Sequence, residues 1–258
     1  MLSNASLNIE EKRPKLFNKL NLLWLVVTVL VFSALVKLGF WQSARALEKE
    51  QRLIKIEQLN AQSAISLAHV VTPVNKSNGF AEVNDFPVVI NGQFDKNQVF
   101  LLDNQVNKGR LGYRAYQVAV TNDYAVLVNL GWVQGSINRQ ELPEITALDG
   151  QHQFKGNIRL IEVGILLQEQ TFSRVQWPLR VQQIELDKFS SLIARQLLPF
   201  VVYVDKNEAL GFEKNWQPIV MPPEKHRAYA FQWFSLALAW LLLMLWAKFG
   251  AYIKTDKS

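Results

Sequence analysis

Two long apolar segments frame the chain, and the residues between them are mixed in polarity. The first segment covers residues 22–41 and the second covers residues 229–249. Each reaches the roughly 20 apolar residues that a helix needs to cross the hydrocarbon core of a membrane. The pattern therefore predicts two membrane-spanning helices with both chain termini on the same side. The expected parts are an N-terminal tail at 1–21, a span at 22–41, a domain at 42–228, a span at 229–249 and a tail at 250–258.

The first segment also has features of a cleaved signal peptide, because basic residues precede it and Ala44-Arg45-Ala46 follows it. A signal core is usually about 7 to 15 residues long, whereas this apolar run is longer and ends in Phe40-Trp41. We therefore expect an uncleaved anchor. Four Lys or Arg residues lie close to each side of this span, so the positive-inside rule leaves the orientation open.

The stretch between the apolar segments changes from a helical to a strand pattern. Residues 42–60 alternate charged and apolar positions and predict that the first helix continues beyond the membrane. A Pro/Asn/Gly cluster at 72–80 breaks this register. Short runs rich in Val, Ile, Tyr and Phe then predict strands at 86–94, 98–106, 111–120, 124–133, 152–161, 179–186 and 199–205, with a hairpin turn at 121–123.

Helical segments are few within this part of the chain. A short helix is predicted at 138–142 and a longer one at 186–198, with Asp187 as the candidate N-cap. Because no helices of ten to fifteen residues alternate with the strands, we expect an antiparallel sheet. The predicted fold class is a membrane α+β protein in which two transmembrane helices flank one mainly antiparallel β domain.

The supply of reactive side chains is small. The chain has no cysteine, three histidines and three methionines, which excludes thiolate metal sites and disfavours copper transfer. Motifs for a nucleophilic serine, a phosphate-binding loop or a zinc protease are missing, so we expect no enzyme. The formal net charge of +6 is explained by lysines beside anionic membrane lipid, and we expect no nucleic-acid partner.

The unusual residues gather at the two membrane boundaries. His226, Tyr229 and Trp233 fall at helical spacing on one face of the second span, and Trp41 and Arg45 lie four apart at the end of the first. An imidazole opposite a guanidinium suits an iron porphyrin, with nitrogen for the metal and arginine for a propionate. Aromatic and basic residues also mark ordinary bilayer interfaces, so both interpretations stay open. Buried amides in spans, such as Gln232 and Gln42, often serve to link helices.

The combination resembles the surfeit-locus (Shy-type) family of cytochrome c oxidase assembly factors. The resemblance is carried by the order of Leu38-Gly39-Phe40-Trp41-Gln42 with Arg45, Val89-Ile90-Asn91-Gly92-Gln93-Phe94, Leu102-Asp103-Asn104-Gln105, Gly112-Tyr113-Arg114, Val126-Leu127-Val128-Asn129-Leu130-Gly131-Trp132-Val133, Trp177-Pro178, and His226 with Tyr229, Ala230, Gln232, Trp233 and Phe234. One departure is Leu130, because the family usually has arginine there, which puts in doubt a charged contact from that position.

The resemblance implies a multi-pass protein of the bacterial inner membrane, with a periplasmic central domain and cytoplasmic termini. It implies an assembly factor that binds haem a transiently and aids its insertion into the large subunit of cytochrome c oxidase, with haem a synthase as a further partner. His226 is the one residue that matches the family's haem-ligating histidine. We expect Tyr229 and Trp233 beside it, and charge and location suggest Arg45, Arg227 and Lys225 as propionate partners.

One alternative keeps the family and removes the haem. In this alternative the protein is a membrane scaffold that holds oxidase subunits or haem a synthase together during assembly, and His226 is an ordinary interfacial residue. Trp132, Trp177 and Trp216 could form a docking surface on the β domain, although core packing is the usual role of such large aromatics.

Overall fold

The computed structural model describes residues 15–71, 80–161, 170, 172 and 175–255. The chain divides into two compact units. One unit joins the two ends of the chain, Met1–Leu53 and Ile219–Ser258, and the other is the central stretch Ile54–Pro218.

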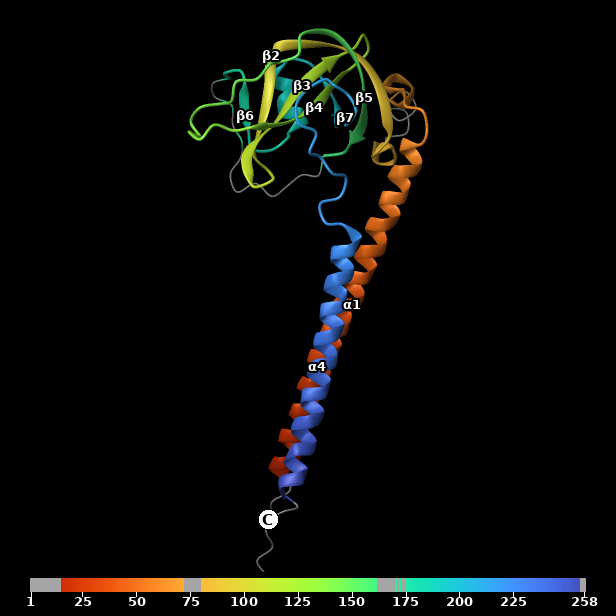
Figure 1. Cartoon of the computed structure of the whole chain (residues 1–258), viewed down its shortest axis with the longest axis vertical. Helices are drawn as coiled ribbons and strands as arrows, with labels where there is room; N and C mark the ends of the chain where they lie inside the picture. Colours follow the sequence, from red (N-terminus) through yellow and green to blue (C-terminus); the bar gives the residue numbers. More distant parts are fainter. Residues whose placement is uncertain (1–14, 72–79, 162–169, 171, 173–174, 256–258) are drawn as a thin grey trace, which may run out of the picture. The chain divides into compact units, whose positions relative to one another are not determined.

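The first unit is a pair of long helices that lie side by side (Figure 1). Helix α1 covers Lys15–Asn60 and helix α4 covers Pro223–Thr255. Both contain stretches long and apolar enough to cross a membrane, and only 11% of each stretch is buried within the protein. Large side chains such as Leu30 and Trp246 are more than half exposed. Apolar surface of this extent is typical of helices that contact lipid or another protein, so the two predicted spans are consistent with a membrane α+β protein.

Helix α1 continues without a break through residues 42–60, as the mixed charged and apolar pattern predicted. The Pro/Asn/Gly cluster at 72–80 lies outside the described residues except for Phe80, which opens a short 3-10 helix, η1, at Phe80–Val83.

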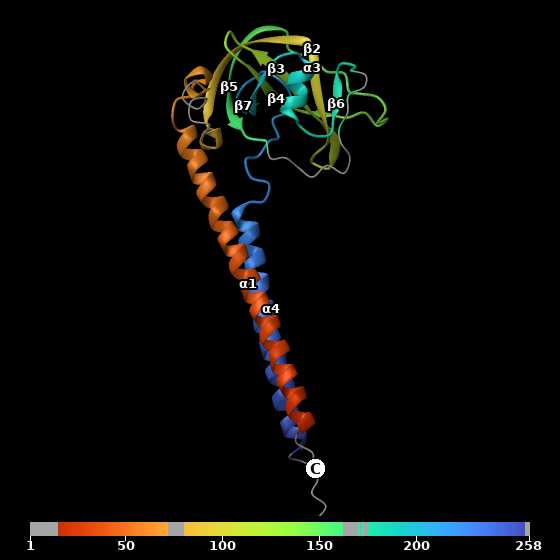
Figure 2. The ribbon, with the colours of Figure 1, turned by 180° about the vertical axis from the view of Figure 1, so that it is seen from behind.

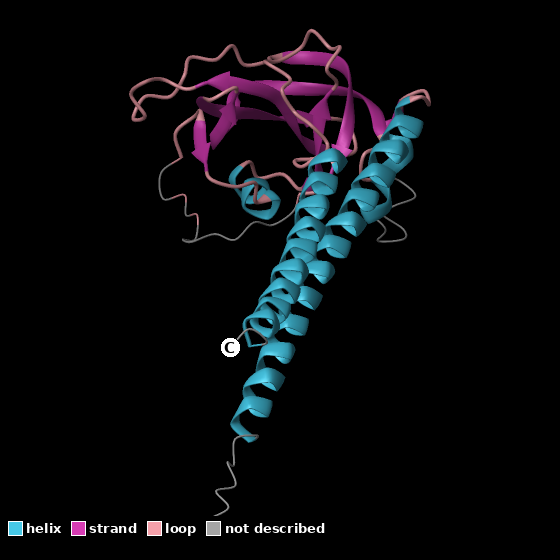
Figure 3. Cartoon of the chain, turned by 60° about the horizontal axis from the view of Figure 1, so that its bottom comes forward, coloured by secondary structure: helices cyan, strands magenta, loops and turns pink. Residues whose placement is uncertain are grey.

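The central unit is a small β-barrel. Its strands are β1 Ile65–Ser66, β2 Pro87–Asn107, β3 Arg110–Val120, β4 Ala125–Gln134, β5 Gly150–Arg159, β6 Leu179–Val181 and β7 Leu197–Val204. Five of these strands follow one another as β2-β3-β4-β7-β5, and β5 pairs back onto β2. The first half of β2 pairs with β5 and its second half with β3, so one long, bent strand closes the sheet (Figure 3).

The barrel buries apolar side chains on both faces of its central strands. One cluster takes residues from all five barrel strands, including Ile90, Val128 and Val202, as the interior of a closed sheet requires. A second cluster lies on the opposite face of β4, around Leu127, and includes residues of β6 and of helix α3, Leu186–Leu192. Figure 2 shows helix α3 beside the strands. The ring of Phe189 on α3 stacks on that of Phe100 on β2, with the two centroids 4.2 Å apart.

Several strand predictions are confirmed with small changes of boundary, and three are corrected. The strands predicted at 86–94 and 98–106 are a single strand, β2, whose pairing with β3 shifts register between Phe94 and Val99. Irregular pairing of this kind bends a strand without ending it. The strand predicted at 179–186 is shortened to β6. The turn at 121–123 is confirmed, because the amide of Thr121 donates to the carbonyl of Tyr124 at 2.8 Å.

The prediction of a mainly antiparallel domain is confirmed, although the sheet also contains parallel pairs. Four strand pairs are antiparallel, but β1–β2, β2–β6 and β4–β7 are parallel, so the sheet is mixed. The long connection between β4 and β7 allows the chain to return and pair in the same direction.

The two helix predictions inside the domain also need correction. Residues 138–142 form a turn, in which the amide of Glu141 donates to the carbonyl of Asn138. The helix predicted at 186–198 ends at Leu192, because Leu197 and Leu198 belong to β7. The residue at its N-cap is Glu185 and not Asp187.

Candidate functional site

The two long helices approach each other closely at Gly39. A Cβ atom at this position would lie 2.6 Å from Cε1 of Phe234, and the ring of Phe40 meets that of Phe234 edge to face at 5.3 Å. Further along the pair, the indole N–H of Trp240 donates to the backbone carbonyl of Thr28 at 3.2 Å. Small residues that allow close backbone approach, and hydrogen bonds between helices, are what hold helices together in a membrane.

His226 lies in the first turns of α4 and faces α1. Its side chain is buried, with 9% of its surface exposed. Nδ1 of the imidazole lies 2.8 Å from Oε1 of Gln42 on α1. Gln42 therefore links the two helices as predicted, and its partner is the candidate haem ligand. Nothing in the sequence pattern identified that partner, since the two residues are separated by 184 positions.

The two aromatic residues of the predicted α4 face are less enclosed than His226. Ala230 is buried one turn after His226, Trp233 is half-buried, and Tyr229 is 44% exposed. The helical spacing thus places His226 and Ala230 toward α1, whereas Tyr229 lies at the edge of this face. Gln232 is exposed.

Both arginines predicted at the boundary are exposed and form ion pairs with carboxylates of α1. Nη1 of Arg45 donates to Oε2 of Glu48 at 2.7 Å, and its guanidinium lies 6.0 Å from the ring centroid of Trp41. Nη2 of Arg227 donates to Oε2 of Glu50, also at 2.7 Å. Sequence reasoning missed both glutamates, although Arg45 and Glu48 have the i,i+3 spacing of a helical ion pair. Lys225 is exposed.

The other two histidines belong to the central unit. His69 is exposed, and Nε2 of His152 lies 2.9 Å from the backbone oxygen of Asp149. Within the described ranges, no group of three or more His, Asp or Glu side chains could hold a metal ion. The three histidines thus lie apart from one another, and of the three only His226 lies between apolar helices.

The Asn-x-Gly-Trp stretch of β4, residues 129–132, has a structural role in the barrel. The amide of Asn129 donates to the hydroxyl of Tyr116 at 3.3 Å and its oxygen accepts from the amide of Gly131 at 2.9 Å. Gly131 has a φ of +119° and lies against the backbone of Phe212, so a side chain there has neither the conformation nor the space. Leu130 is fully buried in the interior cluster. In this chain the position contributes packing in place of a charged contact.

The three tryptophans considered for docking are packed within the domain. Trp132 is 4% exposed and its indole donates to the carbonyl of Gln105 at 2.8 Å. Trp177 meets the ring of Phe100 edge to face. Trp216 lies under the guanidinium of Arg159 at 4.0 Å, and Arg159 forms a buried ion pair with Asp85. These contacts favour the structural role for all three residues.

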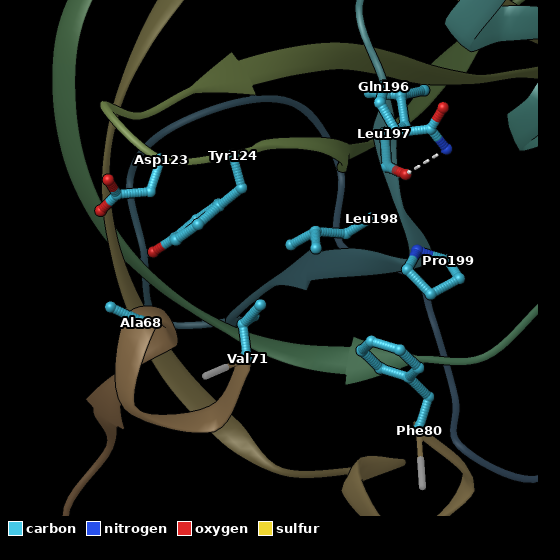
Figure 4. Close-up of a pocket in the computed structure, with 9 residues that line it drawn as sticks. All are labelled: Ala68, Val71, Phe80, Asp123, Tyr124, Gln196, Leu197, Leu198 and Pro199. Carbon is cyan, nitrogen blue, oxygen red and sulfur yellow. Dashed lines mark hydrogen bonds between the residues drawn. The ribbon is translucent and has the colours of Figure 1, made fainter. Parts of the chain in front are cut away.

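One cavity of about 410 Å³ opens in the central unit (Figure 4). The lining residues are Ala68, Val71, Phe80, Asp123, Tyr124, Gln196, Leu197, Leu198 and Pro199. Its polar groups are few, and the amide of Gln196 is bonded to the carbonyl of Leu197. Partial burial raises the pKa of the Tyr124 phenol, against the opposing hydrogen bond from Thr121. None of the residues predicted from the sequence to form a site lies in this cavity.

The structure has the features expected of a membrane α+β protein: two helices long and apolar enough to cross a membrane, one β-barrel domain, and the buried imidazole of His226 between the helices. The model of the SURF1 family matches residues 29–238, and the chain belongs to this family. The family is one of cytochrome c oxidase assembly factors. No curated protein matches the chain.

Proposed function

We propose that this assembly factor binds haem a transiently at the helix pair and aids its insertion into the large oxidase subunit. The observation that supports the proposal is His226, a buried imidazole between two apolar helices. Histidine nitrogen is a common axial ligand of haem iron. His226 would hold the iron, and Tyr229 and Trp233 on the same helix would supply aromatic contacts to the haem.

Arg45, Arg227 and Lys225 are the proposed propionate partners. The two arginines are already bonded to Glu48 and Glu50, but exposed ion pairs contribute little to stability. A propionate could therefore replace either glutamate at low cost, and an arginine binds it with two parallel hydrogen bonds. Partners that exchange easily suit a carrier that must release its cargo.

The remaining partners follow from this role. Haem a synthase would deliver the cargo, and the oxidase large subunit would receive it. No covalent bond is made or broken, so the role requires no catalysis. His226 would be the one protein ligand of the iron, and a site with one protein ligand would favour transfer over permanent storage.

The proposal includes a location. We place the central domain in the periplasm and both termini in the cytoplasm of a bacterial inner membrane. A reporter that is active only outside the cytoplasm should work when joined after residue 150 and fail when joined at Ser258. Activity at Ser258, or a mature chain starting near Leu47, would contradict this arrangement.

The haem role is tested by the absorption spectrum of the full-length protein purified from cells that make haem a. The wild type should show bound haem, His226→Ala should lose it at an unchanged protein level, and His69→Ala and His152→Ala should keep it. Loss of the haem only in the first variant supports the carrier. A wild type without haem, or a His226→Ala variant that retains it, would favour a scaffold that holds oxidase subunits or haem a synthase together.

A further inference from the structure

The contact between His226 and Gln42 favours one of the two neutral tautomers of the imidazole. The Gln42 atom that faces the ring is the amide oxygen, which only accepts hydrogen bonds. Nδ1 of a neutral His226 must therefore be the donor. The second nitrogen, Nε2, then carries the lone pair that can bind a metal.

We propose that Gln42 is a positioning residue for His226, one that fixes both the tautomer and the orientation of the ring so that Nε2 is the nitrogen offered to iron. This inference rests on the haem-carrier function proposed above. Histidines that bind metals almost always donate the other ring N–H to an oxygen, and this bond raises the basicity of the ligating nitrogen. Gln42 supplies that oxygen from the opposite helix.

The helix pair has other contacts for its own stability, which separates positioning from packing. Gly39 against Phe234 and the bond from Trp240 to Thr28 join the same two helices without contacting His226. On α1, Gln42 lies between Gly39 and Ala46, both buried, on one face of the helix. A polar side chain placed among small residues, at the level of the one buried imidazole, is in a position to orient that imidazole.

The first measurement needs no haem. In the full-length protein labelled with ¹⁵N-histidine, the ring-nitrogen signals come from only three imidazoles, because the chain has three histidines. In the haem-free wild type, His226 should carry its proton on Nδ1. In Gln42→Leu this preference should be lost, while in Gln42→Glu, which keeps an acceptor oxygen, it should remain. A wild-type His226 protonated on Nε2 would overturn the proposal whatever the variants do.

The second measurement uses haem a loaded in the producing cells. Gln42→Leu should lower the iron–histidine stretching frequency of the reduced protein and release haem to apomyoglobin about tenfold faster or more, the range typical of losing such an outer contact. Gln42→Glu should raise the frequency and restore retention. Trp240→Phe is the matched control, because it removes a different hydrogen bond between the same helices and should change neither value.

The outcomes distinguish this inference from the function on which it rests. If the wild type holds no haem, or holds it without His226, the carrier function is contradicted. The tautomer measurement remains an independent test of Gln42, because it uses the haem-free protein. If His226 ligates haem but neither Gln42 variant alters the stretching frequency, Gln42 has no positioning role. Equal haem loss in Gln42→Leu and Trp240→Phe would reduce Gln42 to a helix-packing residue.

Discussion

Gly39 and Phe234 form a close contact between the two long helices, since a Cβ at position 39 would meet three ring atoms of Phe234 within 2.9 Å. A ring packed directly on backbone leaves no space for a larger residue. This single contact sets the separation of the helices one turn before Gln42. It therefore controls how far Gln42 lies from His226.

Gly39→Leu is expected to separate the helix pair, because overpacking a close contact costs about 1–3 kcal/mol. The chain has no cysteine, so Glu50→Cys with Arg227→Cys provides a cross-linking pair with no background. A short bismaleimide should join the two cysteines efficiently with Gly39 and poorly with Gly39→Leu. Ser33→Leu adds the same side chain at an exposed position of α1 and should leave cross-linking intact; a loss there as well would indicate a general effect on insertion.

The buried ion pair of Asp85 and Arg159 stabilises the β domain. Their side chains are 5% and 7% exposed, and breaking a buried pair leaves an uncompensated charge at a cost of about 3–5 kcal/mol. Asp85→Asn should lower the free energy of unfolding by up to this amount, measured with denaturant on the full chain. Asparagine is the suitable replacement because position 85 has a φ of +77°, which it tolerates.

The double variant Asp85→Asn with Arg159→Met checks that the charge is the cause. Methionine removes the cation and keeps part of the packing on Trp216. The double variant should be more stable than Asp85→Asn alone. If it is less stable, the loss comes from packing and not from the unpaired charge.

Ionisation of Tyr116 is expected to lower the stability of the β domain at alkaline pH. Burial, with a smaller contribution from Tyr203, raises the pKa of its phenol well above the ordinary value of about 10, while Arg114 acts in the opposite direction. The unfolded chain therefore loses this proton at a lower pH than the folded chain. The free energy of unfolding should fall as pH rises above about 10, because the unfolded state then binds fewer protons.

Tyr116→Phe isolates this effect. The variant should lose less stability between about pH 9 and pH 11 than the wild type, since it has no phenol to ionise at this position. At neutral pH it should be less stable by about 1–3 kcal/mol, because the buried amide of Asn129 loses its acceptor. Parallel alkaline losses in the two proteins would show that Tyr116 does not cause them.

The hydrophobic pattern predicted most of the helices and strands, but little of how the strands pair with one another. Residues 22–41 and 229–249 are apolar on every face, and β4 is apolar at nearly every position, so their lengths and states follow from local sequence. The closure of the barrel does not, because β2 bends between Phe94 and Val99 without a proline or glycine to mark it. The parallel pairing of β4 with β7 depends on contacts more than 60 residues apart.

In the candidate site too, the residues could be predicted from the sequence but their contact partners could not. His226 and Arg45 were selected by residue type and by their place at the ends of the spans. Gln42 as the partner of His226, and Glu50 as the partner of Arg227, could not be predicted, because each contact joins α1 to α4 across more than 170 positions. Only the register of one helix against the other, set by close packing at Gly39, brings these pairs together.

A matched pair of variants at Arg45 and Glu48 distinguishes the haem-carrier function from the scaffold function. Its guanidinium is bonded to Glu48, so Arg45→Gln and Glu48→Gln both remove the same ion pair, but only the first removes the positive charge. If Arg45 binds a haem propionate, Arg45→Gln should weaken haem retention and lower the yield of haem-loaded oxidase at a nearly unchanged protein level. Glu48→Gln should retain haem at least as well as the wild type, because it frees the arginine for the propionate. Equal losses in the two variants, or a drop in the protein itself, would mean that the ion pair stabilises the helix end and that Arg45 is an interfacial anchor.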